Sequence, residues 1–355
     1  MIRLNSLPVI HKASRKAAHK AGRKLFPLLL ALLLATIALP FASCRQSTPA
    51  ADATQAAAAQ PASIPPPVFN PENFDPTPQT PPALKVSGAK AFQLLLDFVA
   101  LGPRYLGSPG HAKAEQFIIS HLEGASEIEQ DRFTAQTAAG RFPMNNIIAK
   151  FPGKKDGIIV LAGHYDTVYP LRNTSFIGAN DGGSNVGLML EIAAQLRAHP
   201  PQGYSVWLLF TDGEEATVEW TDADSVYGSK QLAKQWHADG TASKIKAFLL
   251  LDMIGDKDLD IDRDLNSTPW LLDVVARAAQ RAGHPNFFAR TNMIEDDHLP
   301  FAAVGIPVAD IIDLNYGFNN IYHHTTEDTP DKCSAASLQT VADVVMETIR
   351  ALNTR

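Results

Sequence analysis

The chain has 355 residues, 45% hydrophobic and 19% charged, which is typical of a globular protein with one large domain or two small ones. The formal net charge is −6, but the first 43 residues hold seven of the 31 basic residues and no acidic one, so the remainder carries −13. This acidity argues against nucleic acid as a partner. With Cys44 and Cys333 as the only cysteines, thiolate ligation of a metal is excluded.

The N-terminus has the pattern of an export signal. Basic residues up to Lys24 precede an apolar run, Leu25–Ala42, and Cys44 follows it closely. We expect residues 1–43 to be a bacterial lipoprotein-type signal peptide and Cys44 to carry a lipid. The protein would then be exported to the periplasm, with the lipid or signal anchor as its only membrane contact. The alternatives are an uncleaved anchor, because the run is nearly long enough to span a bilayer, and cleavage elsewhere.

The next segment, residues 44–86, is rich in Ala, Pro, Gln and Thr and contains Ile64-Pro65-Pro66-Pro67. Such a composition cannot bury enough apolar surface to fold. We therefore expect a disordered, semi-extended tether that connects the envelope to a folded domain over residues 87–355.

Helical and strand patterns alternate through that domain. Amphipathic periodicity predicts helices over Ala91–Leu101, Ala112–Leu122, Val186–Leu196, Ser229–Trp236, Trp270–Ala282 and Leu338–Leu352. Short apolar or β-branched runs predict strands over Asn145–Phe151, Ile158–Ala162, Val206–Phe210, Ala247–Leu251 and Val308–Ile312. This alternation predicts an α/β fold, a three-layer sandwich around a central mixed, mostly parallel sheet.

The predicted strand Val206–Phe210 stops at a turn that delivers two adjacent carboxylates, Glu214 and Glu215. Ligands of open α/β sheets bind beyond the carboxyl ends of the strands. Adjacent side chains on an extended segment point in opposite directions, so one carboxylate could hold a metal while its neighbour handles protons. The alternative for this pair alone is a solvated acidic turn.

Further candidate ligands follow other predicted strands or precede helices. Five residues share such positions: His164, Asp181, Glu215, Asp252 and His324. Imidazole and carboxylate are zinc ligands, and a catalytic zinc keeps three protein ligands and one open position. Five such residues at equivalent topological positions therefore predict a zinc centre.

At these positions the chain resembles the zinc-dependent exopeptidases of the aminopeptidase type, and within them the animal-type glutaminyl-peptide cyclotransferases. The resemblance covers about Gly102–Asp328. The broader family is marked by Gly163–Asp166, Gly178–Asp181, Asp212–Glu215, Leu251–Gly255 and His324-Thr325. The cyclotransferases are marked more specifically by Asp212–Ser229, which contains Trp220, and by Ile294–Phe301, which contains Asp296.

The resemblance implies a role for each matching position. Asp181, Glu215 and His324 would hold one zinc, and Glu214 would be the proton shuttle. Asp252 and Asp296 would be hydrogen-bonded to each other and to the reacting amide. The substrate pocket would be formed by Trp220, Ile294, Glu295 and His323. The implied reaction converts the N-terminal glutamine of peptides or proteins to pyroglutamate with release of ammonia.

Two departures and two alternatives accompany this interpretation. The animal enzymes carry cysteines where this chain has Ala162-Gly163, and a tryptophan where it has His323. One alternative is a di-zinc aminopeptidase, in which His164 and Asp252 complete a second metal site bridged by Asp181. The other is a non-catalytic envelope lipoprotein that binds ligands, although a binding pocket has no use for Glu214 as a proton shuttle.

Overall fold

The computed structural model describes residues 69–354, so the predicted signal peptide, Cys44 and most of the predicted tether lie outside the described residues. The centre of the fold is a six-stranded sheet in the order β1-β2-β4-β3-β5-β8. The strands are β1 Glu127–Thr137, β2 Gly140–Phe151, β3 Lys155–His164, β4 Tyr204–Thr211, β5 Ile245–Asp252 and β8 Val308–Ile312.

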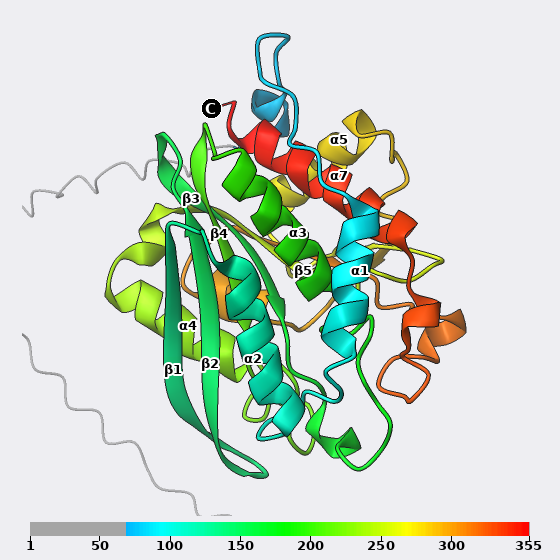
Figure 1. Ribbon diagram of the computed structural model, residues 1–355. Coiled ribbons are helices and arrows are strands. Elements are labelled where there is room, and N and C mark those ends of the chain that lie inside the picture. Colours follow the sequence, from blue (N-terminus) through cyan, green and yellow to red (C-terminus); the bar gives the residue numbers. More distant parts are fainter. Residues whose placement is uncertain (1–68, 355) are drawn as a thin grey trace, which may run out of the picture. The chain divides into compact units, whose positions relative to one another are not determined.

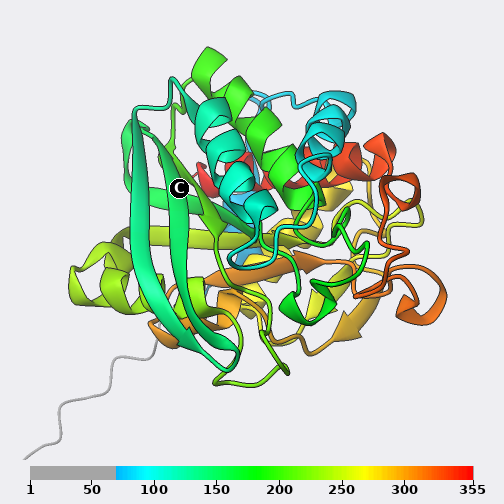
Figure 2. The same ribbon diagram turned by 60° about the horizontal axis from the view of Figure 1, so that its bottom comes forward.

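The sheet is mixed, as the sequence predicts. β3 pairs in parallel with β4 and β5, and β5 pairs in parallel with β8. β1 and β2 form an antiparallel hairpin, and β2 is antiparallel to β4. The hairpin, blue-green in Figure 2, forms one edge of the sheet. The parallel strands are apolar almost throughout because both of their faces are covered.

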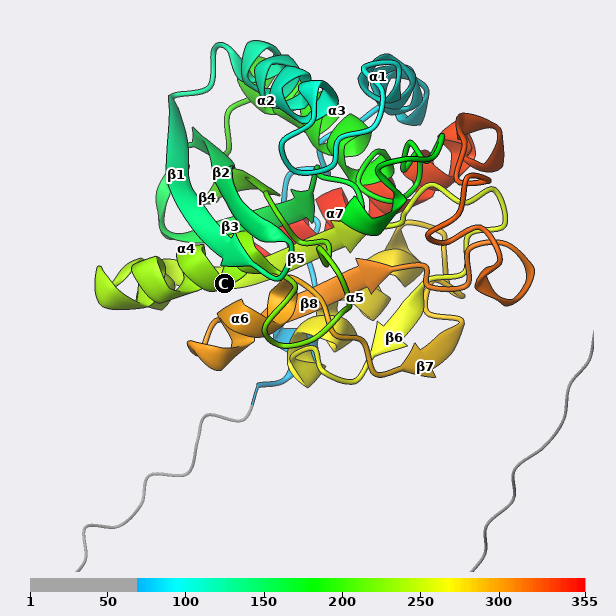
Figure 3. The ribbon, with the colours of Figure 1, turned by 90° about the horizontal axis from the view of Figure 1, so that it is seen from below.

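Helices cover the two faces of the sheet, as Figure 1 and Figure 3 show. The larger core lies under α1 Gly88–Val99, α2 Pro109–Leu122, α3 Ser184–Ala198, α5 Pro269–Arg281 and α7 Ala335–Leu352. The smaller core on the other face is formed with α4 Tyr227–Ala238 and α6 His298–Ala303. Successive side chains of β3 serve the two cores in turn: Val160 packs in the smaller core and Leu161 in the larger. The three-layer α/β sandwich is confirmed.

Short elements complete the fold. β6 Asp262–Asp264 and β7 Arg290–Asn292 form a separate two-stranded parallel sheet. Single turns of 3-10 helix occur at Pro71–Phe74 (η1), Tyr169–Leu171 (η2), Thr241–Lys244 (η3), Phe318–Asn320 (η4) and Pro330–Lys332 (η5). No helix within residues 69–354 is both long and apolar enough to cross a membrane.

Residues 69–86 differ from the sequence-based expectation of a disordered tether, because they lie on the domain; we name them the N-terminal strap. The rings of Phe69 and Phe74 stack on Trp270 of α5, with centroids 4.8 and 5.5 Å apart. Asp75 accepts hydrogen bonds from Arg277 and Arg281. Phe74 is buried against α5. This proline-rich segment has too little apolar surface to fold by itself, and it is ordered by burying its aromatic side chains on the domain.

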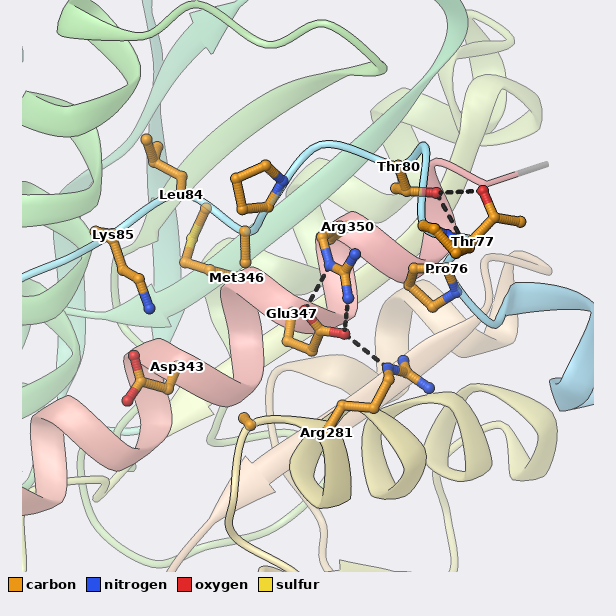
Figure 4. A pocket seen from close by; sticks show the side chains of 14 residues that line it. Pro76, Thr77, Thr80, Leu84, Lys85, Arg281, Asp343, Met346, Glu347 and Arg350 are labelled. Carbon is orange, nitrogen blue, oxygen red and sulfur yellow. Dashed lines mark hydrogen bonds and ion pairs between the residues drawn. The ribbon is translucent and has the colours of Figure 1, made fainter.

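A groove of about 630 Å³ separates the strap from α5 and α7. Figure 4 shows Glu347 of α7 between two arginines on the wall of this groove. Arg281 Nε donates to Glu347 Oε1 over 2.7 Å, and Arg350 Nε donates to Glu347 Oε2 over 2.7 Å. Arg281 also binds Asp75, so this network joins the strap to both helices.

Candidate active site

The candidate site lies where the parallel strands end. β3 ends at His164, β5 ends at Asp252, and two residues separate the end of β4 from Glu214 and Glu215. Parallel pairing brings these ends to one edge of the sheet, where a cavity of about 380 Å³ opens. His164 does not line it but lies 3.2 Å from two residues that do, Asp181 and Asp252. The lining includes every other predicted site residue: Asp181, Glu214, Glu215, Trp220, Asp252, Ile294, Glu295, Asp296, His323 and His324.

One group of metal-ligand side chains is centred on His324. Its Nε2 lies 3.2 Å from Glu215 Oε2 and 3.3 Å from Asp181 Oδ2. His324 has a φ of 51°, a left-handed conformation that costs energy for a residue other than glycine. Such strain is typical of functional sites, where the surrounding structure enforces it. The three ligands predicted for a single zinc are therefore brought together.

A second group is centred on His164. Its Nε2 lies 3.2 Å from Asp181 Oδ1 and 3.2 Å from Asp252 Oδ1. Asp181 thus directs one carboxylate oxygen to each histidine, the arrangement of a bridging ligand. The residues predicted as ligands of either metal position thus lie close together.

The donor atoms of both groups fit a divalent cation. Glu215 is 2% exposed, and neither of its carboxylate oxygens has a hydrogen-bond partner among the described residues. The same holds for Asp181 Oδ2 and His164 Nδ1. Buried carboxylate oxygens whose only close neighbour is a histidine nitrogen, and which accept no hydrogen bond, are costly, and a bound cation removes that cost. Oxygen and imidazole nitrogen donors without thiolate are a suitable set for zinc.

Two further acids of the cavity are in an environment that favours the protonated form. Burial raises the pKa of Glu214 well above its ordinary value, and the charges of Glu215 and Asp296 add to the rise while His164 opposes it. Burial and the neighbouring charge of Asp252 likewise raise the pKa of Asp296 well above its usual range. The raised pKa makes the Glu214 carboxylate a stronger proton acceptor than an ordinary glutamate, which suits a group that takes up and returns a proton.

The expected hydrogen bond between Asp252 and Asp296 is not present among the described residues. Asp252 turns Oδ1 toward His164 instead. Asp296 accepts through Oδ1 from the backbone N–H of Asp297 over 2.5 Å, and its Oδ2 is buried without a partner. The two acids interact through their charges, and Asp296 keeps one oxygen free for a ligand.

Asp166 fixes the turn that carries the two glutamates. Its Oδ1 accepts from the backbone N–H of Glu214 over 3.2 Å and its Oδ2 from that of Glu215 over 3.3 Å. On the other side, His111 of α2 binds Asp212 over 2.7 Å. The sequence predicts no role for Asp166 or His111, although Asp166 belongs to the Gly163–Asp166 motif.

Arg104 and Asp328 fix the loop that carries Asp181. Arg104 is fully buried and donates to the carbonyl oxygens of Tyr165 and Gly178 over 2.9 and 2.8 Å. The Asp328 carboxylate accepts from the backbone N–H of Asp181 over 3.2 Å. Sequence reasoning missed both residues because their partners are backbone groups far away in the chain.

The walls of the cavity come from three segments. Trp220, with 36% of its surface exposed, belongs to the loop between β4 and α4. Ile294 is buried, and its backbone N–H donates to Asp264 Oδ1 over 3.0 Å, whereas Glu295 is exposed. The ring of His323 packs against that of His324 at a tilt of 38°, with ring centroids 3.9 Å apart. The predicted pocket residues thus surround the metal-ligand groups.

Comparison with known proteins identifies the family. The model of peptidase family M28 matches residues 146–349, more than half of the chain. The chain belongs to peptidase family M28. The match includes both groups of candidate metal ligands and the Glu214–Glu215 turn.

Individual proteins show which members of the wider group this chain resembles in sequence and structure. The glutaminyl-peptide cyclotransferase of Boiga irregularis is 30% identical over 280 residues, 68% of this chain and 75% of that protein. The crystal structure of an Acidobacteriales bacterium glutaminyl cyclase is 54% identical, has a TM-score of 0.76, and covers 79% of this chain and 99% of its own. The leucine aminopeptidase precursor of Bacteroides thetaiotaomicron is more distant, with 25% identity, a TM-score of 0.68 and 76% and 98% coverage.

Proposed function

We propose that this M28 protein is a zinc-dependent glutaminyl-peptide cyclotransferase, an acyltransferase that converts the N-terminal glutamine of peptides or proteins to pyroglutamate and ammonia. The observation that carries the proposal is the pair of buried acids, Glu214 and Asp296, facing one small cavity beside a ligand triad. The 54% identity to a bacterial glutaminyl cyclase supports the choice of reaction.

The substrate's N-terminal glutamine would occupy the cavity between Trp220 and Ile294, with its side-chain amide directed toward the acids. Exclusion of water by these walls strengthens the electrostatic interactions inside. An apolar wall opposite charged groups also orients the flexible glutamine side chain, so that its amine can reach its own amide carbon.

The reaction needs one proton to move between two nitrogens. Glu214 as carboxylate would accept a proton from the α-ammonium or from the attacking amine as the bond between this nitrogen and the side-chain carbonyl carbon forms. It would return a proton to the amide nitrogen as the old carbon–nitrogen bond breaks and ammonia leaves. Asp296 in its protonated form, which burial favours, would donate a hydrogen bond to the reacting amide through Oδ2, which has no partner among the described residues. No external water is consumed.

Zinc held by Asp181, Glu215 and His324 would supply a Lewis acid for the amide oxygen. We propose one zinc per chain. The complete second group of His164, Asp181 and Asp252 favours one alternative, a di-zinc aminopeptidase in which Glu214 serves as general base for water. The likeness to a leucine aminopeptidase precursor supports the same alternative.

Zinc stoichiometry and substrate choice separate these possibilities on one sample. The chain without residues 1–43 would be purified, its zinc counted, and glutaminyl-peptide and leucine-anilide substrates assayed. We expect one zinc, with pyroglutamate and ammonia released in equal amounts. Two zincs with anilide cleavage would establish the aminopeptidase, and no turnover of either substrate would favour a binding protein.

We also propose export and anchoring through the N-terminus, with lipid on Cys44. The support is the basic segment, apolar run and cysteine in the first 44 residues. Metabolic labelling of the full chain with a fatty-acid analogue, compared with Cys44→Ser, tests it. Equal labelling of both chains would contradict lipidation at this residue.

A further inference from the structure

The loop between the glutamate turn and α4 is closed onto that turn. We call residues 216–226 the Trp220 loop. At its end, the backbone N–H of Val226 donates to the carbonyl of Glu214 over 2.7 Å, and that of Tyr227 donates to the carbonyl of Gly213 over 2.8 Å. The base of the loop is therefore tied directly to the residue proposed as proton shuttle.

One carboxylate, that of Asp224, fills the interior of this loop. Its Oδ1 accepts from the backbone N–H and the hydroxyl of Thr217, over 3.1 and 2.6 Å, and from the hydroxyl of Tyr227 over 2.6 Å. Its Oδ2 accepts from the backbone N–H groups of Val218 and Glu219, over 2.8 and 3.1 Å. Five hydrogen bonds to a side chain that is 4% exposed make Asp224 the organising group of the loop.

These contacts bracket Trp220 on both sides. Glu219, immediately before Trp220, donates to Asp224, and Thr221, immediately after it, accepts from the backbone N–H of Asp224 through its hydroxyl over 3.1 Å. The Thr217 hydroxyl also accepts from the backbone N–H of Ala139 in the β1–β2 turn, over 3.1 Å. The Trp220 side chain is partly exposed, so packing alone does not hold it. The hydrogen bonds of the backbone on either side of it fix its place at the cavity.

The hydrogen bonds to Asp224 favour its ionised form. Burial alone would raise the pKa of Asp224, but the hydrogen bonds from Thr217, Tyr227 and Glu219 outweigh burial and hold it well below the usual range. Asp224 is therefore ionised at neutral pH and acts purely as an acceptor. An asparagine there would present an N–H₂ group to at least one set of these donors.

We propose that Asp224 is a positioning residue that holds Trp220 as a preformed wall of the substrate cavity, at a fixed place relative to Glu214. This inference rests on the proposed function, because it requires Trp220 to contact the substrate. Asp224 acts on substrate affinity through Trp220 and takes no part in proton transfer. A preformed wall saves the cost of ordering the loop when substrate binds.

The test compares Asp224→Asn with Asp222→Asn. Asp222 is an exposed acid of the same loop, and its carboxylate accepts no hydrogen bond from the backbone of the described loop. Asp222→Asn therefore removes one negative charge, as Asp224→Asn does, but leaves the hydrogen bonds of Asp224 intact. We expect Asp224→Asn to raise KM for a glutaminyl peptide about tenfold with kcat within about threefold, and Asp222→Asn to change neither. Equal loss of kcat and kcat/KM in Asp224→Asn would overturn the positioning role.

A double-mutant cycle asks whether the effect passes through Trp220. In a Trp220→Ala background, Asp224→Asn should raise KM by less than about twofold further, because the wall is already gone. A full tenfold rise in that background would contradict the proposal. Tyr227→Phe, which removes one donor to Asp224, gives a milder variant if Asp224→Asn is poorly folded, and a KM equal to wild type would count against the proposal.

Amide hydrogen exchange tests the ordering of the Trp220 loop by Asp224 without relying on enzyme activity. The amides of Thr217, Val218 and Glu219 donate to Asp224, so the peptide containing them should exchange about tenfold faster in Asp224→Asn and unchanged in Asp222→Asn. Unchanged exchange in Asp224→Asn would overturn the inference even with cyclase activity present. Absence of cyclisation by the wild type, with the exchange difference intact, would instead refute the proposed function and with it the effect on substrate.

Discussion

Glu214 and Glu215 are neighbours in the chain but face different partners. Glu215 lies 3.2 Å from His324, as expected for a metal ligand, and burial raises its pKa to about 7. The Glu214 carboxylate lies 3.9 Å from His164 Nδ1 and shares the cavity with Asp296. Adjacent positions on an extended turn give the two carboxylates opposite directions, which is why one sequence motif can supply both a ligand and a proton carrier.

We predict that Glu214→Gln abolishes cyclisation and leaves zinc content near normal. Glutamine keeps the shape of the side chain but cannot carry the proton, and loss of a general base costs about 10²–10⁴-fold in rate. The rate of ammonia release and the zinc content would be measured together. Glu219→Gln, an exposed acid of the Trp220 loop, is the matched control and should behave as wild type. Loss of zinc from Glu214→Gln would mean that the two glutamates have the opposite roles.

At the scale of elements, the sequence predicts the buried strands and the polar residues that follow them. The buried parallel strands are continuous apolar runs, and a parallel sheet brings their ends together, so His164, Glu215 and Asp252 could be grouped without a structure. The sequence does not predict β1, because it is an edge strand whose side chains are nearly all exposed or half-buried, and it lacks a continuous apolar face.

Residues that act on distant backbone groups could not be predicted in the same way. Arg104 and Asp328 hold the Asp181 loop from positions 77 residues before and 147 residues after Asp181. Neither has a side-chain pattern that indicates this, because a backbone carbonyl or N–H group is present at every position in the chain. The role of Asp224 has no side-chain signal either: its partners lie only three to seven residues away, but three of its five hydrogen bonds come from backbone amides.

The N-terminal strap gives a prediction at the element scale. A chain that begins at Ser87 loses the burial of Phe74, its stacking on Trp270 and the ion pairs of Asp75 with α5. The aromatic burial and stacking are worth about 2–4 kcal/mol, and the half-exposed ion pairs add little. We therefore expect the free energy of unfolding to be about 2–4 kcal/mol lower than for a chain that begins at Phe69.

Denaturant unfolding of the two chains measures this difference, and kcat per folded molecule should be the same for both, because the strap does not line the active-site cavity. Asp75→Asn in the longer chain is the control for the ion pairs and should cost less than about 1 kcal/mol. Equal stability of the two truncated chains would show that the strap contributes nothing to folding.

The whole molecule is acidic and also buries many acids, which ties its stability to pH and to metal. Burial raises the pKa of Asp313 to about 6 and those of Asp328 and Glu215 to about 7. A carboxyl group whose pKa is raised by folding stabilises the fold fully at low pH, below its unfolded pKa near 4. That contribution is lost as the pH rises through its folded pKa. For the metal-free protein we thus expect stability to fall between about pH 4 and 8.

Bound zinc should reverse much of this loss, because zinc binds the ionised form of Glu215 and compensates its charge. The gain in Tm caused by zinc should therefore grow between pH 5.5 and pH 8, as protons cease to compete for the ligands. Thermal unfolding of chelator-treated and zinc-loaded protein at both pH values measures this gain. Glu215→Ala, which removes the titrating ligand, should show a small gain at either pH. A gain in the unaltered chain that is equal at both pH values would indicate that proton release from buried ligands is not coupled to zinc binding.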